Sequence, residues 1–252
     1  MEISRITNEQ YDERFYYSKE KINPRTGTHW FPSYHFLMSV GAPVSNHLVE
    51  WWKNYGHEAD RILKQKEVRG SWVHDRIEMI TKFNQVVTQS DIEAAWGNNP
   101  SDMLFVQRAL TGFFNFLNEE QAQVVSSERM ILGEDWGGTM DLELRLKSDN
   151  YANLWIIDIK TAKSVYNEHL QQVEAYRRVT GADKAGVLIL GNSTRKRYTF
   201  TAVVDKHRDH LYELFLAEKE TAYKILTKEN RLQPTEETFP KEYSMNLLKI
   251  GE

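Results

Sequence analysis

The chain contains no cysteine among its 252 residues. Disulfide bonds, thiolate zinc sites and cysteine-bound iron–sulfur clusters are therefore excluded. No apolar run approaches the roughly 18 residues that would predict a membrane span. With 40% hydrophobic and 27% charged residues, the composition is that of an ordinary soluble globular protein.

Signatures of export and of nucleotide-driven motors are also missing. Residues 1–7 have no apolar signal core and do not resemble an Arg/Ser-rich transit sequence, so we expect a cytoplasmic location. The chain has no G-x-x-x-x-G-K-[ST] element, which excludes a P-loop motor. Gly191-Asn192-Ser193 is not a serine nucleophile elbow, and no Ser/His/Asp set stands out.

Net charge gives only a weak indication of the partner. The formal charge of −4 is not that of a typical nucleic-acid binder. Residues 160–209 nevertheless hold ten Lys/Arg against five Asp/Glu, an excess of five positive charges. Local positive potential there would suit a polyanionic substrate, whereas scattered surface charge is the simpler alternative.

The second half of the chain predicts a mixed sheet. Residues at 140, 142, 144 and 146 are apolar and alternate with polar ones, which indicates a strand with one buried face. The predicted strands span 124–132, 139–146, 154–160, 185–190 and 197–204, with a helix over 166–179 and a closing helix that includes 211–226. The order β-β-β-α-β-β predicts the α/β class, with a mixed central β-sheet flanked by helices.

The first half predicts a hairpin followed by helices. Aromatic residues around an Asn-Pro…Gly turn at 23–27 indicate two short strands. Ser33 is a candidate N-cap, and Pro43 and Ser45 open another helix. Further helices are expected over 57–68 and 71–84, with Gly70-Ser71 between them, and from Asp102 onward after the break at 98–101.

The predicted helix after Ser45 has an aromatic stripe formed by Leu48, Trp51, Trp52 and Tyr55. Such a stripe usually belongs to the core, and stacking of nucleic-acid bases is the alternative.

The stretch around Asp158 is the clearest candidate site. Leu154–Ile157 reads as a buried strand, and Asp158 and Lys160 follow it on one face, roughly 7 Å apart. Asp141 follows a Gly-Gly turn on the neighbouring strand. A carboxylate and a lysine at a strand end suit a metal-dependent phosphodiesterase, while a structural ion pair is an equal alternative.

A histidine on a preceding helix offers a further ligand. His74 and Glu78 are spaced i, i+4 beside the apolar stripe of Val73, Ile77 and Ile80. Taken alone, such a pair is more often a local polar contact than a metal site.

Together these elements resemble the PD-(D/E)XK nuclease superfamily, in its RecB-like branch. The resemblance rests on Gly138-x-x-Asp141, Asp158-Ile159-Lys160-Thr161, His169-x-x-Gln172-x-x-x-Tyr176 and the helix from Gly70 to Glu78. The aromatic hairpin followed by Phe31-Pro32-Ser33 is similar to the start of phage and mitochondrial genome maintenance exonucleases. The four elements span about residues 15–205 in family order. Met140 stands where the superfamily's name has proline.

The resemblance implies a restriction-endonuclease-like fold in one nuclease domain over residues 1–252. Its parts would be a hairpin plus a helical N-terminal addition (1–120), a catalytic core (121–228) and a tail (229–252).

The resemblance also implies a set of site residues. The metal ligands would be His74, Asp141, Asp158 and the main-chain oxygen of Ile159. Lys160 would be the catalytic lysine, and Gln172 and Tyr176 would position the phosphate or the lysine. Asp141 and Asp158 would act in catalysis through the metal, and Glu78 and Glu128 are weaker candidates for an outer shell or a second ion. The ion would be Mg²⁺ or Mn²⁺, which hard oxygen ligands suit.

The function implied is a metal-dependent DNA nuclease, an exonuclease of recombination, repair or replication in a bacterial or phage-infected cell. Its partners would be DNA, single-stranded or with free ends, and a single-strand-binding or annealing protein, with no membrane. The first alternative is an inactive nuclease fold kept as a DNA-binding or adaptor protein, and the second is a hydrolase of another phosphoester. Polarity, strand preference, DNA versus RNA and the number of metal ions stay open.

Overall fold

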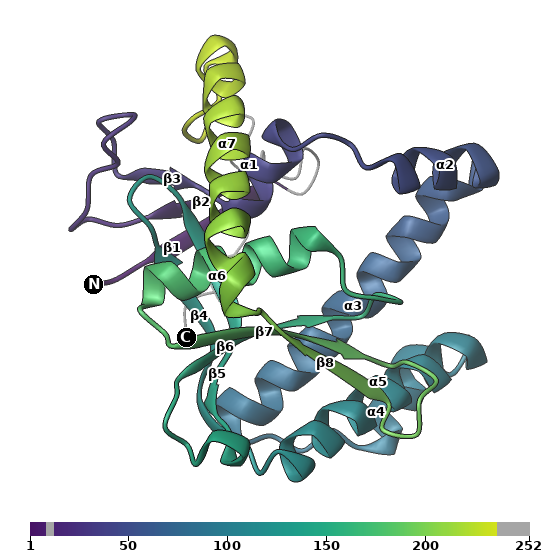
Figure 1. The fold of residues 1–252 in the computed structure, drawn as a ribbon. Coiled ribbons are helices and arrows are strands. Elements are labelled where there is room, and N and C mark those ends of the chain that lie inside the picture. Colours follow the sequence, from purple (N-terminus) through teal and green to yellow (C-terminus); the bar gives the residue numbers. More distant parts are fainter. Residues whose placement is uncertain (9–12, 236–252) are drawn as a thin grey trace, which may run out of the picture. The chain divides into compact units, whose positions relative to one another are not determined.

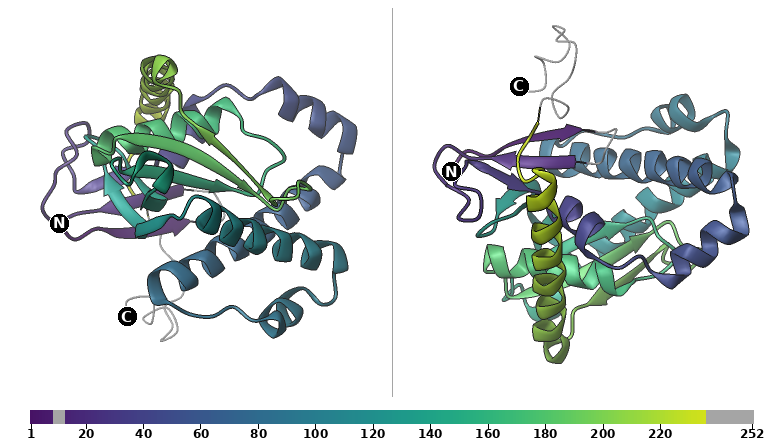
Figure 2. Two further views of the ribbon diagram at one scale, coloured as in Figure 1. Left: turned by 60° about the horizontal axis from the view of Figure 1, so that its bottom comes forward. Right: turned by 90° about the horizontal axis from the view of Figure 1, so that it is seen from above.

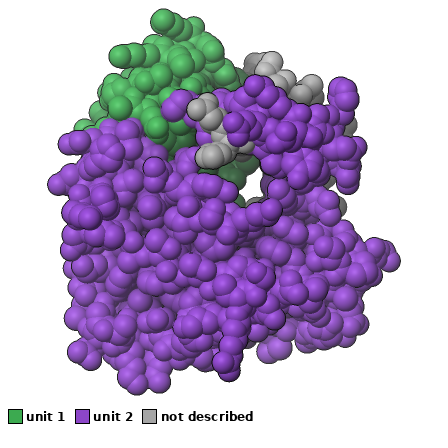
Figure 3. Space-filling view, turned by 45° about the vertical axis from the view of Figure 1, so that its right-hand side comes forward, with its two compact units in different colours: residues 1–42, 130–138, 216–252 green, residues 43–129, 139–215 purple. Residues whose placement is uncertain are grey.

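The computed structural model describes residues 1–8 and 13–235. The chain divides into two compact units, coloured separately in Figure 3. Unit 1 comprises Met1–Ala42, Met130–Gly138 and Leu216–Glu252, and unit 2 comprises Pro43–Arg129 and Thr139–Phe215. The single nuclease domain expected from the sequence stays a prediction.

Unit 1 contains the predicted aromatic hairpin. Strands β2 (Glu13–Tyr17) and β3 (Trp30–Pro32) pair antiparallel, and β1 (Ser4–Asn8), which was not predicted, adds a third strand beside β2. Helix α1 (Tyr34–Gly41) begins after Ser33, whose side chain accepts a 3.0 Å hydrogen bond from the N–H of Phe36. The predicted N-cap is thereby confirmed.

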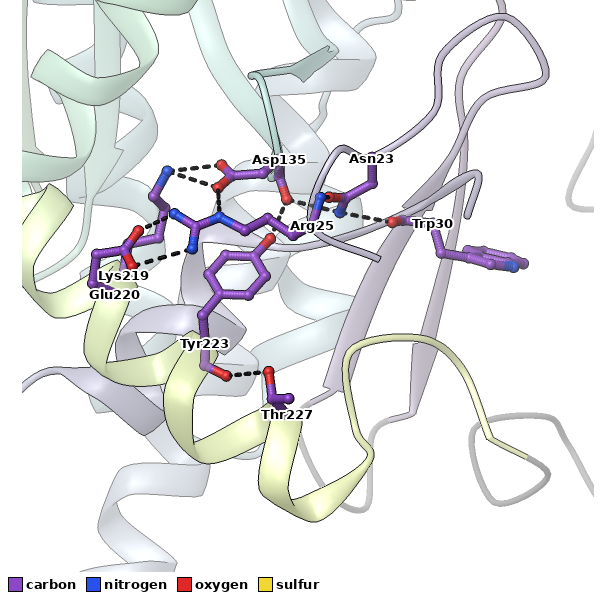
Figure 4. A network of polar contacts seen from close by, with 8 residues as sticks. All are labelled: Asn23, Arg25, Trp30, Asp135, Lys219, Glu220, Tyr223 and Thr227. Carbon is purple, nitrogen blue, oxygen red and sulfur yellow. Dashed lines mark hydrogen bonds and ion pairs between the residues drawn. The ribbon is translucent and has the colours of Figure 1, made fainter. Parts of the chain in front are cut away.

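A buried carboxylate connects three segments of unit 1 that are far apart in the sequence (Figure 4). Asp135 is 2% exposed, and its carboxylate lies 2.8 Å from Lys219 Nζ and 3.0 Å from Arg25 Nε. Its main-chain oxygen accepts hydrogen bonds from Asn23 Nδ2, at 3.0 Å, and from the Tyr223 hydroxyl. Lys219 and Tyr223 belong to helix α7 (Asp205–Glu229). The local sequence pattern around Asp135 does not predict this network.

The five-stranded sheet confirms the predicted mixed α/β class. Its order is β4-β5-β6-β7-β8. Strand β5 pairs antiparallel with β6, β6 pairs parallel with β7 through the crossover helix α6, and β7 pairs antiparallel with β8. The elements are β4 (Gln123–Leu132), β5 (Gly137–Arg145), η1 (Lys147–Asp149), β6 (Trp155–Lys160), α6 (Asn167–Thr180), β7 (Lys184–Leu190) and β8 (Tyr198–Ala202).

Helices cover both faces of this sheet in unit 2. The core on one face joins side chains of α3, α4 and α5 to the apolar faces of β5 to β8, with Phe113 and Phe116 among the fully buried members. Figures 1 and 2 show α3 and α5 along that face and α6 on the other. The helices between unit 1 and the sheet in chain order are α2 (Asn46–Tyr55), α3 (Glu58–Phe83), α4 (Gln89–Trp96, not predicted) and α5 (Pro100–Glu119).

Helix caps in unit 2 follow the sequence. Ser45 caps α2 at the predicted helix start. Asn99, within the predicted break at 98–101, caps α5, and Pro100 occupies the first position of that helix, two residues before the expected start at Asp102. None of the helices in the described ranges is long and apolar enough to cross a bilayer. Helix α7 ends at Glu229, so most of the expected tail, residues 236–252, lies outside the described residues.

The predicted division at Gly70-Ser71 is wrong. Helix α3 runs without interruption from Glu58 to Phe83. A Cβ built on Gly70 would lie 3.0 Å from Thr161 Oγ1, just after β6, so glycine at this position allows a close approach rather than ending the helix.

The aromatic stripe of α2 is not part of the core, contrary to the first expectation. Trp52 is 40% exposed and Tyr55 is 48% exposed, and none of the described side chains of α2 is buried. Trp51 stacks on Tyr55 instead, with ring centroids 4.9 Å apart.

Candidate metal centre

Two neighbouring strands bring the aspartates together. Leu142 of β5 pairs with Ile157 of β6, so Asp141 and Asp158 are the next residues on the two antiparallel strands. Beyond that pair, Asp141 Oδ2 accepts a 2.6 Å hydrogen bond from the main-chain N–H of Ile159. At the end of the strand, the carboxylate of Asp141 thus takes the place of the main-chain carbonyl that would accept this hydrogen bond in a regular antiparallel pair.

Helix α3 supplies His74 to the same place. Gly70 and His74 are spaced i, i+4 and share one face of the helix. The close approach at Gly70 therefore sets His74, one turn later, beside the end of β6. His74 Nδ1 lies 3.7 Å from Asp141 Oδ1 and 4.0 Å from Glu128 Oε1.

The structure gives Glu128 a more central place than the sequence suggested. One ligand atom from each of His74, Glu128 and Asp141 lies within 4.8 Å of the others. Glu78, the other weak candidate, pairs with Lys82 on α3 at 2.9 Å. A hydrophobic pattern cannot reveal which of two acidic residues faces a site on another element, because that depends on long-range packing.

Lys160 connects the aspartates to helix α6. Its Nζ donates to Asp158 Oδ1 at 2.9 Å and to Gln172 Oε1 at 3.2 Å. Gln172 Nε2 in turn donates to the Tyr176 hydroxyl at 3.4 Å, one helical turn further along. Because Gln172 and Tyr176 are spaced i, i+4 on one face of α6, their side chains form a chain of hydrogen bonds that ends at Lys160.

Burial dominates the electrostatics of the site. Burial raises the pKa of Asp141 and of Asp158 to about 6, although the charge of Lys160 opposes the rise in both. Burial also lowers the pKa of His74 to about 4, and Lys160 adds to this effect. For Lys160, burial disfavours the charge, but Asp158 and Asp141 outweigh it and raise the pKa. At neutral pH both carboxylates are ionised, His74 is neutral and Lys160 is charged.

His169 also belongs to the surroundings of the lysine. It lies in the first turn of α6, where its Nδ1 accepts a 3.3 Å hydrogen bond from the main-chain N–H of Tyr166. Burial and the charge of Lys160 lower its pKa to about 4. The motif included this histidine without giving it a role.

The donor set fits a small divalent cation. Asp158 is 3% exposed, and both of its carboxylate oxygens lie 2.9 Å from Lys160 Nζ. The ammonium of Lys160 faces two buried carboxylates, Asp158 and Asp141, so the cluster keeps a net negative charge that a cation would balance. The main chain of Ile159 lies beside the imidazole of His74, where it partly opposes the lowering of the His74 pKa. Carboxylate, carbonyl and imidazole donors suit Mg²⁺ or Mn²⁺.

No protein-family model and no curated protein matches the chain. Among solved structures, the chain is similar to an alkaline exonuclease from Laribacter hongkongensis, at 15% identity, covering 57% of this chain and 92% of that one, with a TM-score of 0.33. It is also similar to a phage-related exonuclease from Haemophilus somnus, at 14% identity, covering 78% and 95%, with a TM-score of 0.32. Likeness at this level assigns no role to any residue.

Proposed function

We propose that this chain is a metal-dependent DNA nuclease that hydrolyses phosphodiester bonds with Mg²⁺ or Mn²⁺. The observation that supports it is the convergence of Asp141, Asp158 and His74 beside Lys160, where two buried carboxylates face a single ammonium. A structural ion pair would need neither the histidine nor a second carboxylate. The order of the matching motifs adds the nuclease assignment to this metal chemistry.

In this proposal His74, Asp141, Asp158 and the main-chain oxygen of Ile159 hold the cation. When bound, the cation would neutralise charge on the phosphate and activate water for attack. Asp141 is held in place by the N–H of Ile159, so the ligand geometry is largely set before binding. His74, being neutral, offers a lone pair without first losing a proton.

Lys160 has a separate task in this proposal. Asp158 and Gln172 fix its ammonium group, which therefore cannot swing freely into solvent. An ammonium fixed beside the cation can orient the attacking water and stabilise charge developing on the phosphate. Gln172 and Tyr176 position the lysine through the hydrogen-bond chain on α6.

The substrate proposed is DNA, single-stranded or with free ends, and the action proposed is that of an exonuclease in recombination, repair or replication. The direct test is digestion of single- and double-stranded oligonucleotides labelled at either end, with Mn²⁺ and with EDTA as the control. Cleavage that requires the metal would support the proposal, and the labels would report polarity and strand preference. Absence of Mn²⁺-dependent cleavage on every substrate would refute it.

Metal affinity is expected to depend on pH. Because the pKa of Asp141 and of Asp158 is raised to about 6, both carboxyls become protonated below that pH, and a cation must displace the protons. His74, with a pKa of about 4, stays neutral through this range. The Mn²⁺ affinity should therefore be nearly constant above about pH 7 and should fall by up to about 100-fold per pH unit below about pH 5.5.

Isothermal titration with Mn²⁺ between about pH 5 and pH 7 measures this dependence. An affinity that stays level across the window would show that neither carboxylate binds the ion. Calcium chelation by EDTA, titrated in the same buffers, controls for the buffer's own proton uptake.

A further inference from the structure

A turn follows strand β7 at the edge of the sheet that holds the candidate metal centre. Strands β6 and β7 are parallel, with Lys160 opposite Ile189, so both strands run towards the same edge. The turn, residues 192–197, begins after Gly191, roughly 7 Å beyond the level of Lys160. Ligands of open α/β sheets bind outside the carboxyl ends of parallel strands. The turn therefore lies where a substrate held at the centre would pass.

The chain that leaves this edge is basic. The turn and the segment after β6, residues 161–166, contain Lys or Arg and neither Asp nor Glu. Their basic residues are Lys163, Arg195, Lys196 and Arg197. Lys196 pairs with Glu119 of α5. Lys163 and Arg195 are exposed and form no ion pair with any residue in the described ranges. Positive charge at this edge is thus available to a polyanion such as DNA.

Helix α5 fixes the main chain of this basic turn (residues 192–197). Asn115 Nδ2 donates to the main-chain oxygen of Lys196 at 3.0 Å. A Cβ on Gly112 would collide with the main-chain oxygen of Arg197, so only glycine permits this approach. The N–H of Gly191 donates to the same oxygen at 3.0 Å. The basic turn therefore lies against α5, as Figure 1 shows, and its main chain is held from both sides.

Packed side chains connect the basic turn to the metal centre. The ring of Phe105, on α5, lies against Gly191, where an added Cβ would be 2.8 Å from it. The guanidinium of Arg69 is 3.6 Å from the centroid of the same ring. Arg69 precedes Gly70, where α3 approaches the end of β6. The separation between the basic turn and the centre is therefore set by packing within unit 2.

We propose that the basic turn binds backbone phosphates of DNA that extends from the metal centre, with Arg195 and Arg197 as the contacts. This inference rests on the proposed nuclease function and deepens it. A guanidinium is always charged and can bond a phosphate through two parallel N–H groups. Arg197 Nη1 donates to the main-chain oxygen of Ser193 at 3.4 Å, and the other N–H groups of this guanidinium remain for a phosphate. Because the turn is already fixed, binding orders little further chain.

Three double variants separate phosphate binding from a structural role. Arg195→Gln with Arg197→Gln removes both charges, whereas Arg195→Lys with Arg197→Lys keeps them. Arg145→Gln with Lys147→Gln is the matched control, because it removes two positive charges at the other end of the sheet. Arg145 is the last residue of β5 and lies beside the start of β6.

The experiment is fluorescence anisotropy of labelled single- and double-stranded oligonucleotides with the full chain. EDTA is present, so that neither cleavage nor the cation contributes, and KCl is varied from about 50 to 200 mM. The glutamine pair should bind single strands about tenfold more weakly than wild type at the lowest salt, and its salt slope should be shallower by about 1.4, or about 0.7 per phosphate lost. The lysine pair and the control should bind within about twofold of wild type.

Cleavage with Mn²⁺ provides a second measurement. The glutamine pair should raise KM for the oligonucleotide and leave kcat and Mn²⁺ affinity unchanged, because the contact lies away from the reacting phosphate. A structural role would instead lower the melting temperature of the glutamine pair without changing the salt slope.

The outcomes distinguish the two proposals. If wild type cleaves DNA and the glutamine pair keeps its affinity and salt slope, or loses no more affinity than the control, the role of the basic turn is overturned and the nuclease function stands. DNA binding that depends on the turn, without any cleavage, would refute the nuclease function and leave the phosphate contact standing. If wild type neither binds nor cleaves DNA, both proposals fail.

Discussion

Lys160→Met is expected to slow Mn²⁺-dependent DNA cleavage by about 10²- to 10⁴-fold while Mn²⁺ binding persists. Methionine preserves the apolar stem of the side chain but removes the ammonium that Asp158 and Gln172 hold in place. Removing a positive charge beside a cation site does not weaken the attraction of the ion, so binding and chemistry should separate. Single-turnover cleavage and isothermal titration measure the two quantities.

Asp158→Asn is the companion to this variant. It removes a charged ligand and should abolish both detectable Mn²⁺ binding and cleavage. Arg145→Gln is the control. Arg145 is the last residue of β5 and bonds main-chain oxygens of residues 151 and 152, so this variant should cleave DNA at the wild-type rate. Cleavage by Lys160→Met at the wild-type rate would contradict the role assigned to the lysine.

Asp135→Asn is expected to have the largest effect on stability. The carboxylate of Asp135 neutralises the ammonium of Lys219, whose side chain is only 8% exposed, and also contacts Arg25. Removing the carboxylate of a buried pair takes away the counter-charge that the Lys219 ammonium faces, which costs about 3–5 kcal/mol. At roughly 2–4 °C per kcal/mol, thermal unfolding of the chain should shift down by about 10 °C.

A second substitution tests the cause of that loss. Adding Lys219→Met to Asp135→Asn removes the buried ammonium that Asp135 would otherwise neutralise, and should restore part of the lost free energy of unfolding. Glu220→Gln, on the exposed side of the same network, should cost less than about 1 kcal/mol. If Asp135→Asn costs as little as Glu220→Gln in urea denaturation, the buried pair does not stabilise unit 1.

Local patterns were sufficient for most strands and helix starts. The alternation of Met140, Leu142 and Leu144 predicts β5 because side chains on a strand point alternately to its two faces. Ser33 and Ser45 predict helix starts because their side chains accept hydrogen bonds from free N–H groups in the first turn. These are contacts between residues a few positions apart.

Apart from the unpredicted β1 and α4, the errors involve contacts between distant segments. Gly70 was taken for a helix boundary because its closeness to Thr161 cannot be read from neighbouring residues. Trp51, Trp52 and Tyr55 have the spacing of a buried helix face, yet Trp52 and Tyr55 are exposed because no other described element packs over them. The network around Asp135 was not anticipated, since its partners are about 84 to 112 residues away in the chain.

The sequence by itself determined the mixed α/β fold, because the alternation and spacing of apolar residues predict the order of strands and helices. It also put Asp158 and Lys160 on one face of a strand, because side chains two residues apart on a strand point the same way. Only the tertiary structure decided that His74 of α3 and Glu128 of β4 reach Asp141. Those contacts depend on the close approach of α3 at Gly70 and on the left-handed backbone conformation at Glu128, each fixed by packing between elements rather than by local propensity.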